Sequence, residues 1–386
     1  MIAPPGAIEL KEGSTTLFVP SEHSVKGPGK RIGRVFYNQQ MAFNRDISVL
    51  FYQAACMECR SGFDAMSATG ARGVRILKES GTKAQFVLND KDAEAVRFIQ
   101  ANLELNGLEG ASANQDDLRS HLAKHVYDYV DLDPFGTPAP FVQAVFQGCK
   151  RNAIVAITAT DTAPLAGTHA KKCLRRYMAR PLRCVFGHEV GLRVLIGYLA
   201  REAAQLDKGI EPLLCFYADH YFRIYLRLKE NAAAADRSLS NLGYLSFDRE
   251  TLVREVSHEF SENAAGPLWV SPLTEKRLLD NMTNVDSMQH PVRCAKYLNI
   301  WRNELDVPYF YENNELSSHL HSSPPDLERM LDRIRQNGKA SRTHFSPSGF
   351  KTDLSIKELL ALYPEVSRVE PNSLSNSWRM RSPVKG

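Results

Sequence analysis

Between residues 60 and 160 the chain alternates short apolar runs with stretches whose apolar residues recur at helical spacing. The apolar runs predict strands at 63–67, 85–90, 111–117, 127–133 and 153–160. The stretches between them predict helices at 71–80, 91–107, 118–125 and 139–150. Strands that alternate with helices of this length form βαβ units. The pattern therefore predicts an α/β fold with a doubly wound, Rossmann-like sheet covered by helices on both faces.

Beyond residue 160 the pattern changes. Residues 188–206 predict another amphipathic helix, and the strand runs at 213–220 and 221–228 are close enough to form a hairpin. The segment NAAAADRSLS at 231–240 is small and polar, so we expect a loop there. Residues 324–338 combine an initial proline, an apolar stripe and a terminal glycine. They predict a helix that belongs to a small helical module at 316–345.

The length of 386 residues is typical of two domains. Because the alternating pattern has ended by Gly266-Pro267, we expect one domain at 1–266 and a smaller α+β domain at 267–386. No run of about 18 apolar residues is present, so we expect no transmembrane helix. Charges and prolines occupy the N-terminus, where a signal peptide would need an apolar core. The expected location is therefore the cytoplasm.

Seven cysteines are scattered along the chain, and their odd number and irregular spacing do not suit a disulfide framework. We expect them to be reduced, as is usual in the cytoplasm. Cys56 and Cys59 form one close pair. A zinc site would need a second pair or histidines at ligand spacing, so no metal is expected. No obligate protein partner is indicated either.

The turn after the first predicted strand is the first candidate ligand site. It reads Thr69-Gly70-Ala71-Arg72-Gly73. A strand, a glycine-bearing turn and a helix can hold an adenosyl ligand close to backbone amides, because glycine has no Cβ in the way. A tight turn without a ligand explains this segment alone equally well. A dehydrogenase is disfavoured, because the leading glycine of the dinucleotide motif is missing.

Acidic residues follow the second and third predicted strands. Asp90 lies 20 residues beyond Gly70, a spacing at which an acid can accept hydrogen bonds from ribose hydroxyls. Asp116 and Asp117 precede Leu118, where an acid can accept a hydrogen bond from an adenine amino group. Aspartate is also a good N-cap for the helix that follows. One member of the pair can serve each purpose, and the sequence does not assign them.

The exit of the fourth predicted strand is the most informative segment. It reads Asp131-Leu132-Asp133-Pro134-Phe135-Gly136-Thr137-Pro138. Proline stiffens such a loop, and Phe135 has no obvious burial site, so we expect it to stack on a flat ligand. A carboxylate here can accept an N–H hydrogen bond from an aromatic amine and take its proton during methyl transfer. Asp133 is nearer the loop, whereas Asp131 can support Asp133 or hold the loop.

Blocks of sequence along nearly the whole chain, in order, resemble those of the tRNA guanine-26 N2-dimethyltransferases. The hallmark is DPFGTP at 133–138. The others are VFYN at 35–38, MAFNRD at 41–46, SATGARG at 67–73, TATD at 158–161, HEVG at 188–191, DHYFR at 219–223, GPLW at 266–269 and RTHFSP at 342–347. The resemblance implies a class I methyltransferase domain, a C-terminal domain peculiar to the family, S-adenosylmethionine as cofactor and tRNA as substrate.

The resemblance also implies the roles of individual residues. Asp133 would be the catalytic carboxylate, and Phe36 and Phe135 would hold the guanine beside Pro134. A buried core aromatic is the competing interpretation of Phe36. The implied cofactor contacts are Arg45, Thr69, Gly70, Arg72, Asp90, Asp116, Asp117 and Leu118. Some members carry a zinc cluster before the GPLW block, but residues 241–265 contain no cysteine here, so no zinc is expected.

A basic segment after the last predicted parallel strand indicates a surface for tRNA. The net charge of +4 is only mildly basic, but no acid lies between Asp161 and Glu189. The segment contains Lys171, Lys172, Arg175, Arg176, Arg180 and Arg183. On one helix, residues 172, 175, 176 and 180 would share a face. A solvated helix face is the alternative to phosphate contact. A second basic set comprises Arg329, Arg333, Arg335, Lys339 and Arg342.

Two other functions are also consistent with the sequence. One is an amino methyltransferase that acts on another nucleic-acid base or on a protein amide, since such enzymes use a related loop. The other is a tRNA-binding protein without activity, against which the intact Asp133 and the cofactor turn argue. The sequence does not distinguish the addition of one methyl group from the addition of two.

Overall fold

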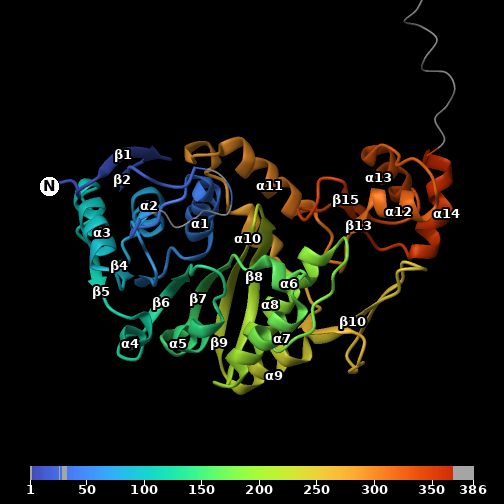
Figure 1. The fold of residues 1–386 in the computed structure, drawn as a ribbon, viewed down its shortest axis with the longest axis horizontal. Coiled ribbons are helices and arrows are strands. Elements are labelled where there is room, and N and C mark those ends of the chain that lie inside the picture. Colours follow the sequence, from blue (N-terminus) through green and yellow to red (C-terminus); the bar gives the residue numbers. More distant parts are fainter. Residues whose placement is uncertain (1, 26, 28–32, 368–386) are drawn as a thin grey trace, which may run out of the picture.

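The computed structural model describes residues 2–25, 27 and 33–367 (Figure 1). Its centre is a sheet with the strand order β5-β4-β3-β6-β7-β9-β8. The strands are β3 (Ser61–Asp64), β4 (Gln85–Asp90), β5 (Ala111–Gln115), β6 (Tyr127–Leu132), β7 (Cys149–Ala159), β8 (Lys208–Ala218) and β9 (Tyr221–Glu230). Strands β3 to β7 are parallel, and β9 is antiparallel to both neighbours. The predicted doubly wound sheet and the β8–β9 hairpin are confirmed, and the strand order reverses between β3 and β6.

Helices cover both faces of this sheet. On β6, Val130 and Leu132 belong to one apolar core and Tyr129 to another, because successive side chains point to opposite faces. The helices around the sheet are α1 (Ala42–Ala55), α2 (Ala71–Ser80), α3 (Ala93–Leu105), α4 (Leu118–Leu122), α5 (Val142–Gln147), α6 (Thr162–Leu165), α7 (Ala170–Tyr177) and α8 (Gly187–Ala204). Burial of the sheet on both faces explains the near-continuous apolar runs in the sequence.

The chain after β9 first extends this body and then forms a separate unit. The segment α9 (Ala232–Ser240) leads into a small sheet of β10 (Leu242–Phe247), β11 (Arg254–Ser257) and β12 (Ala265–Trp269). The helices α10 (Lys276–Asp280) and α11 (Pro291–Asn303) share an apolar core with α1. The predicted boundary at residue 266 therefore falls inside β12, and the segment up to Asn303 packs with the central sheet.

The C-terminal unit, coloured orange to red in Figure 1, has an apolar core of its own. It consists of β13 (Tyr311–Glu312), α12 (Asn313–His319), α13 (Leu327–Arg335), β14 (Ala340–Arg342), β15 (Gly349–Thr352) and α14 (Ile356–Ser367). The helix predicted at 324–338 is confirmed as α13. The predicted module at 316–345 is not purely helical, because β14 lies within it and pairs with β15.

The loop predicted at 231–240 is wrong, because these residues form α9. The Asn231 side chain accepts a hydrogen bond from the backbone N–H of Ala234 at 2.8 Å and so caps the helix. The alanines that follow have the highest helix propensity of all residues. Small and polar composition was therefore a poor guide here, because the segment contains no glycine or proline.

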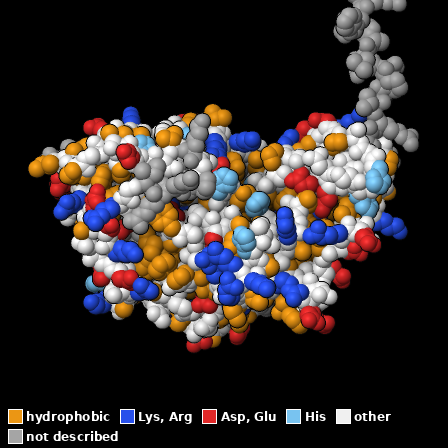
Figure 2. Space-filling model, viewed as in Figure 1, with side chains coloured by type: hydrophobic (Ala, Val, Ile, Leu, Met, Phe, Trp, Pro, Cys, Tyr) orange, Lys and Arg blue, Asp and Glu red, His pale blue; other side chains and the backbone are white. Residues whose placement is uncertain are grey.

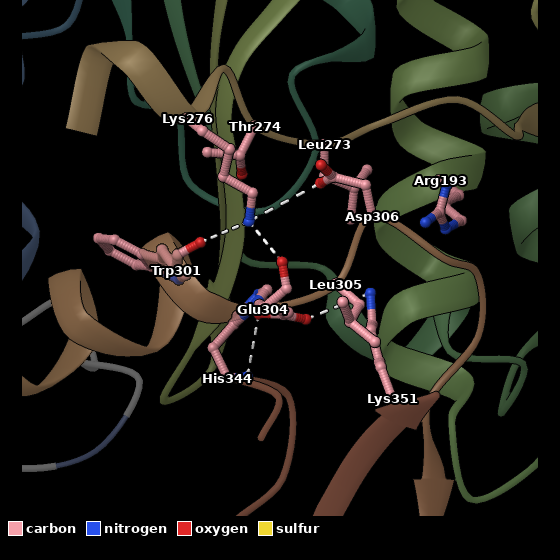
Figure 3. Close-up of a pocket in the computed structure, with 10 residues that line it drawn as sticks. All are labelled: Arg193, Leu273, Thr274, Lys276, Trp301, Glu304, Leu305, Asp306, His344 and Lys351. Atoms are coloured by element: carbon pink, nitrogen blue, oxygen red, sulfur yellow. Dashed lines mark hydrogen bonds and ion pairs between the residues drawn. The ribbon is translucent and has the colours of Figure 1, made fainter. Parts of the chain in front are cut away.

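Buried charges join the C-terminal unit to the rest of the chain. Lys351 of β15 lies 3.2 Å from Glu189 of α8 and 3.2 Å from Glu304, which follows α11. The Nδ1 atom of His344 lies 2.6 Å from the second carboxylate oxygen of Glu304 (Figure 3). Burial would raise the pKa of Glu304, but His344 and Lys351 hold it well below its usual value. These contacts fix the C-terminal unit to α8 and α11.

The described residues contain neither a membrane-spanning helix nor a metal-binding cluster. No helix there is both long and apolar enough to cross a bilayer. No group of three or more histidine, cysteine, aspartate or glutamate side chains in this part of the chain could hold a metal ion. All seven cysteines are free thiols.

A second buried charge network holds the N-terminal hairpin of β1 (Ala7–Glu12) and β2 (Thr15–Pro20). The Glu12 carboxylate lies 2.6 Å from Arg45 of α1 and 2.8 Å from Arg75 of α2. Arg75 also pairs with Asp46 and Glu79 at 2.8 Å each. All these side chains are buried, so the loss of one leaves charge without compensation.

We expect Glu12→Gln to destabilise the fold and to remove part of its acid sensitivity. Burial would raise the pKa of Glu12, but Arg45 and Arg75 lower it from 4.5 to about 2. A lowered pKa stabilises the fold above pH 4.5, and this stabilisation is lost as the pH falls towards 2. The difference corresponds to about 3 kcal/mol.

The measurement is urea unfolding at several pH values between 7 and 3. Glu9→Gln, on an exposed position of the same strand, is the matched control. If Glu12→Gln and Glu9→Gln show the same free energy of unfolding and the same pH dependence, the Glu12 network does not stabilise the fold.

Candidate active site

A cavity of about 470 Å³ lies at the carboxyl ends of β3, β4, β5 and β6. This is the switch point of the sheet, where doubly wound folds bind ligands. Among the residues predicted from the sequence, it is lined by Phe36, Arg45, Thr69, Arg72, Asp90, Asp116, Asp117, Leu118, Asp133, Pro134 and Phe135. Gly70 does not line the cavity itself but lies between two residues that do, Thr69 and Ala71.

The fold requires glycine at two positions in and after the turn that follows β3. Gly70 has a φ of +76°, which favours glycine, and it is the N-cap of α2. A Cβ on Gly73 would lie 2.9 Å from Cγ of Leu88, so this glycine lets α2 pack directly on β4. Gly70 is therefore required by the turn, and Gly73 by the packing of α2 on β4. The same turn brings Thr69 to the cavity.

Asp64, at the end of β3, is a site residue that the sequence reasoning did not assign. Its side chain is buried, lines the cavity, and has one oxygen, Oδ2, without a hydrogen-bond partner in the described structure. Burial and the nearby charge of Asp131 raise the pKa of Asp64 to about 7. A buried carboxylate without a partner is suited to a cationic ligand. Its place at a strand end, directly before the glycine turn, was the available signal.

The acids after β4 and β5 are held differently. Asp90 accepts backbone N–H groups of Ala68 and Asp92 at 3.0 Å each, which fixes its carboxylate at the cavity wall. Asp117 caps α4 and pairs with Arg119 at 2.8 Å. The hydrogen bond from Arg119 lowers the pKa of Asp117 to about 2. Asp116 has no side-chain hydrogen bond within the described residues, so it is the member of the pair available to a ligand.

The loop after β6 is anchored to Thr160, the residue that follows β7. The N–H of Gly136 donates to Oγ1 of Thr160 at 2.8 Å, and the N–H of Thr160 donates back to the carbonyl of Gly136 at 2.9 Å. This anchor leaves Pro134 buried and Phe135 62% exposed. Such exposure is unusual for phenylalanine and agrees with a ring held ready for a flat ligand.

Phe36 and Phe135, from distant parts of the sequence, meet at the cavity. Their ring centroids lie 4.7 Å apart with an interplanar angle of 78°, an edge-to-face contact. Phe36 is partly exposed, so it is not the buried core aromatic that its sequence context also allowed. The two rings and Asp133 line the same cavity.

The Asp133 carboxylate is bound by Arg72. Its Oδ2 accepts a hydrogen bond from this arginine, and its side chain remains 24% exposed to the cavity. Asp131, two residues earlier, is buried and binds Arg223 through both oxygens. Burial would raise the pKa of Asp131, but Arg223 and Arg72 hold it below its usual value.

Arg45 lines the cavity, yet its guanidinium is engaged elsewhere. The Nε and NH2 atoms both donate to Glu12 at 2.6 Å, and NH2 also donates to the backbone carbonyl of Asn38 at 3.1 Å. Arg45 therefore closes the wall of the cavity through its packing more than through a free charge.

The basic segment from Lys171 to Arg183 lies only partly on a helix. Lys171, Lys172, Arg175 and Arg176 belong to α7, but the helix ends at Tyr177. Arg180 instead forms a bridge with Gly266, so the prediction that it shares the helix face is wrong. Figure 2 shows lysine and arginine side chains gathered over the region that α7 occupies in Figure 1.

The residues in and beside this basic segment differ in their ion pairs and hydrogen bonds. Arg176 pairs with Asp161 at 2.9 Å, and Tyr177 bonds both Asp161 and Thr137 of the loop after β6. The helix is thus attached to the cavity loop. In the second basic set, Arg335 and Arg342 are paired with acids, so less of its charge is free.

Nearly the whole chain is similar to known proteins. A family model described as N2,N2-dimethylguanosine tRNA methyltransferase matches residues 13–363. The chain is similar to the tRNA (guanine(26)-N(2))-dimethyltransferase of Pyrococcus abyssi, with 39% identity, covering 90% of this chain and 96% of that protein. The protein of the same name from Saccharolobus solfataricus is 37% identical over 91% of this chain and 97% of its own length.

A solved structure agrees with these relatives. Trm1 from Pyrococcus horikoshii in complex with S-adenosyl-L-methionine superposes with a TM-score of 0.83 at 34% sequence identity. The superposition covers 92% of this chain and 99% of that one. The likeness thus extends over the sheet, the small β10–β12 sheet and the C-terminal unit.

Proposed function

The chain belongs to the N2,N2-dimethylguanosine tRNA methyltransferase family, and we propose from this which residues of the cavity perform its reaction. The protein transfers methyl groups from S-adenosylmethionine to the exocyclic N2 of guanine 26 in tRNA. We assign Asp133 as the catalytic carboxylate. The observation that supports this assignment is the convergence of Asp133, Phe36 and Phe135 on one cavity with the strand-end acids.

The residues of the cavity fit S-adenosylmethionine. When bound, the cofactor supplies a methyl group on a positively charged sulfur. Asp64, whose buried Oδ2 has no hydrogen-bond partner among the described residues, would bind the ammonium group. Asp90 would accept hydrogen bonds from the ribose hydroxyls, and Asp116 would accept one from the adenine amino group. Leu118 would pack beside the adenine ring. Thr69 and Gly70 would position the backbone of the turn.

Asp133 would act on the amine of the guanine. The nitrogen lone pair is delocalised into the ring, so the amine is a poor nucleophile. A carboxylate that accepts one of its N–H bonds raises the electron density on nitrogen. As the new N–C bond forms and the S–C bond breaks, that proton passes to Asp133, which leaves a neutral methylated amine. The remaining contribution is alignment of the nitrogen with the methyl carbon.

Phe36 and Phe135 would receive the guanine. A base stacked inside folded tRNA must be extruded to reach the cavity, at a cost of a few kcal/mol. Stacking on an aromatic side chain returns about 1–3 kcal/mol per base. Insertion between Phe36 and Phe135 requires the two rings to leave their edge-to-face contact. Pro134 would restrict this movement to the exposed side of the loop.

The tRNA would lie across α7 towards the C-terminal unit. We propose that Lys171, Lys172, Arg175, Arg176 and Arg180 contact its phosphates and that residues 267–386 contribute further contacts, of which 368–386 lie outside the described residues. Recognition would depend on the shape and backbone of the folded RNA more than on its base edges. The proposed location is the cytoplasm, with which the seven free thiols agree.

We expect the protein to methylate a tRNA transcript with guanine at position 26 and not one with adenine there. Incorporation of labelled methyl groups measures this. Asp133→Ala should lower the rate by about 10²–10⁴-fold, because the proton acceptor is lost. Cofactor binding to the variant should remain, as measured by calorimetry. A variant that methylates as fast as the wild type would exclude Asp133 as the base, and label in both transcripts would remove the position assignment.

The two acids after β5 should differ in their effects. Asp116→Ala should raise the Kd for S-adenosylmethionine by roughly 10-fold, through loss of a hydrogen bond to a charged acceptor. Asp117→Ala should leave this Kd nearly unchanged but lower the free energy of unfolding by about 1 kcal/mol, because α4 loses its cap. Calorimetry and urea unfolding separate the two effects. The reverse pattern would assign the adenine contact to Asp117.

Removal of Lys171 and Arg175 together should weaken tRNA binding and flatten its salt dependence. Neither side chain has an ion-pair partner in the described part of the chain, so both are available to phosphates. Each lost phosphate contact lowers the slope of log K against log salt by roughly 0.7–0.9. The control removes two other exposed cations, Arg151 and Arg237. An unchanged slope in a filter-binding titration of the Lys171/Arg175 variant would exclude this surface.

A further inference from the structure

We infer that Tyr177 and Asp161 are positioning residues, which hold the loop that carries Asp133 in the place where the reaction needs it. The inference rests on the proposed roles of Asp133 and of α7, the helix assigned to the tRNA surface. Neither Tyr177 nor Asp161 lines the cavity. They join the loop after β6 and the proposed phosphate contacts of α7 into one unit.

The loop after β6 is held at two neighbouring residues, Gly136 and Thr137. The backbone of Gly136 bonds Thr160, and its carbonyl also accepts the N–H of Asp161 at 3.3 Å. The hydroxyl of Thr137 lies 2.7 Å from the hydroxyl of Tyr177. The two attachments come from different elements, because Thr160 and Asp161 follow β7 whereas Tyr177 ends α7. Both lie close to Asp133 in the sequence, so both affect its position.

The Asp161 carboxylate sets the direction of these hydrogen bonds. Its Oδ1 and Oδ2 atoms lie 2.7 and 2.8 Å from the hydroxyl of Tyr177. A carboxylate can only accept, so Tyr177 donates its single hydroxyl proton to Asp161. The Tyr177 oxygen is then left to accept, and the hydroxyl of Thr137 donates to it. Loss of the acid or of the tyrosine hydroxyl would therefore also release Thr137.

Tyr177 is itself fixed to α8. Its side chain is buried, and its ring packs edge to face on Tyr198 with the centroids 5.5 Å apart. Arg201 donates to the backbone carbonyls of Tyr177 at 2.6 Å and of Met178 at 3.2 Å, and so satisfies the end of α7. Most of α8 is buried in the core. The Tyr177 hydroxyl is thus a fixed point against which the loop is held.

Arg176 connects this arrangement to the proposed tRNA surface. Its NH1 bonds Asp161 at 2.9 Å, whereas its Nε and NH2 have no hydrogen-bond partner among the described residues. The side chain is 33% exposed, so one guanidinium can hold Asp161 and also contact a phosphate. Arg175, the preceding residue, is exposed and has no ion-pair partner in the described part of the chain. A phosphate bound by Arg176 would therefore be joined to the loop, and one bound by Arg175 would not.

The three residues Asp161, Tyr177 and Thr137 affect the chemical step and not cofactor binding. None of them lines the cavity. The acids proposed to bind the cofactor follow β3, β4 and β5, whereas these three residues hold the loop after β6. Asp133 must meet the guanine nitrogen while that nitrogen is aligned with the methyl carbon. A misplacement of about 1 Å can cost 10²-fold in rate, and a loop that is held by Thr160 alone is free to make such a shift.

The test compares Tyr177→Phe and Thr137→Val with the wild type on the tRNA that carries guanine 26. Each variant removes one hydroxyl of the same hydrogen bond and keeps most of the side chain. We expect each to lower kcat by about 10- to 100-fold, with the Kd for S-adenosylmethionine and the KM for tRNA changed by less than about 3-fold. The double variant should lower kcat no further than the single ones, because the bond is already lost. A raised KM for tRNA with kcat retained, or independent effects of the two changes, would overturn the inference.

Tyr363→Phe is the matched control. Tyr363 is a buried tyrosine of the C-terminal unit, and its hydroxyl donates to the carbonyl of Asn313 at 3.0 Å. Loss of this hydroxyl should lower the free energy of unfolding without the loss in kcat. If Tyr363→Phe lowers kcat as much as Tyr177→Phe does, the effect is one of general stability and the inference is wrong. Should Tyr177→Phe not fold, Thr137→Val tests the same hydrogen bond with every buried aromatic ring in place.

Arg176→Ala and Arg175→Ala test the connection to the tRNA surface. Both variants should raise the KM for tRNA by a few-fold, because each loses a phosphate contact. Arg176→Ala should in addition lower kcat at saturating tRNA by about 10-fold, because Asp161 loses one of the two side chains that hold it. Equal kcat values in the two variants would exclude Arg176 as the connection. Failure of the proposed function is distinguishable, because the wild type would then not methylate guanine 26, or Asp133→Ala would retain full activity.

Discussion

Asp131 is a carboxylate buried in the middle of a sheet, and the cavity above it depends on the arginines that keep it charged. Burial alone would raise its pKa, but Arg223 and Arg72 hold the pKa below its usual value. Asp64, on the neighbouring strand, has no ion pair among the described residues, and burial and the charge of Asp131 raise its pKa to about 7. Removal of one partner from a buried ion pair commonly costs about 3–5 kcal/mol. The position of Asp133 is thus determined by charge balance beneath it as much as by the loop that carries it.

Buried ion pairs of the same kind lie at the two ends of the molecule. Glu12 attaches the N-terminal hairpin to α1 and α2 through arginines, and Lys351 attaches the C-terminal unit to Glu189, 162 residues away in sequence. Buried ion pairs add little net stability compared with apolar packing. Their effect is selective, because any other packing of these segments would leave a charge buried and unpaired. Both segments are therefore held in one arrangement.

Much of the sheet and several site residues could be predicted from the sequence, because the information is local. Apolar runs with helical stretches between them identify parallel strands, and ligand-binding side chains follow strand ends. The partners of these residues could not be predicted. Arg45 and Arg72 line the cavity, but the sequence did not show that Glu12 and Asp133 would pair with them. Asp117 could be assigned as the cap of α4 only from its backbone geometry. The helix at α9 was missed because an alanine-rich segment was taken for a loop.

The rigid junction at Lys351 and Glu304 has a consequence for how a nucleotide is chosen. Buried charges hold the C-terminal unit against α8 and α11 and so set its distance from Asp133 in this structure. Folded tRNA is itself a stiff object of defined length. If tRNA contacts the C-terminal unit as proposed, it is held at two points, and a nucleotide must lie at a set distance from that contact to reach the cavity. The nucleotide would then be selected by its distance from the second contact, and the edge of its base would be recognised only in the cavity.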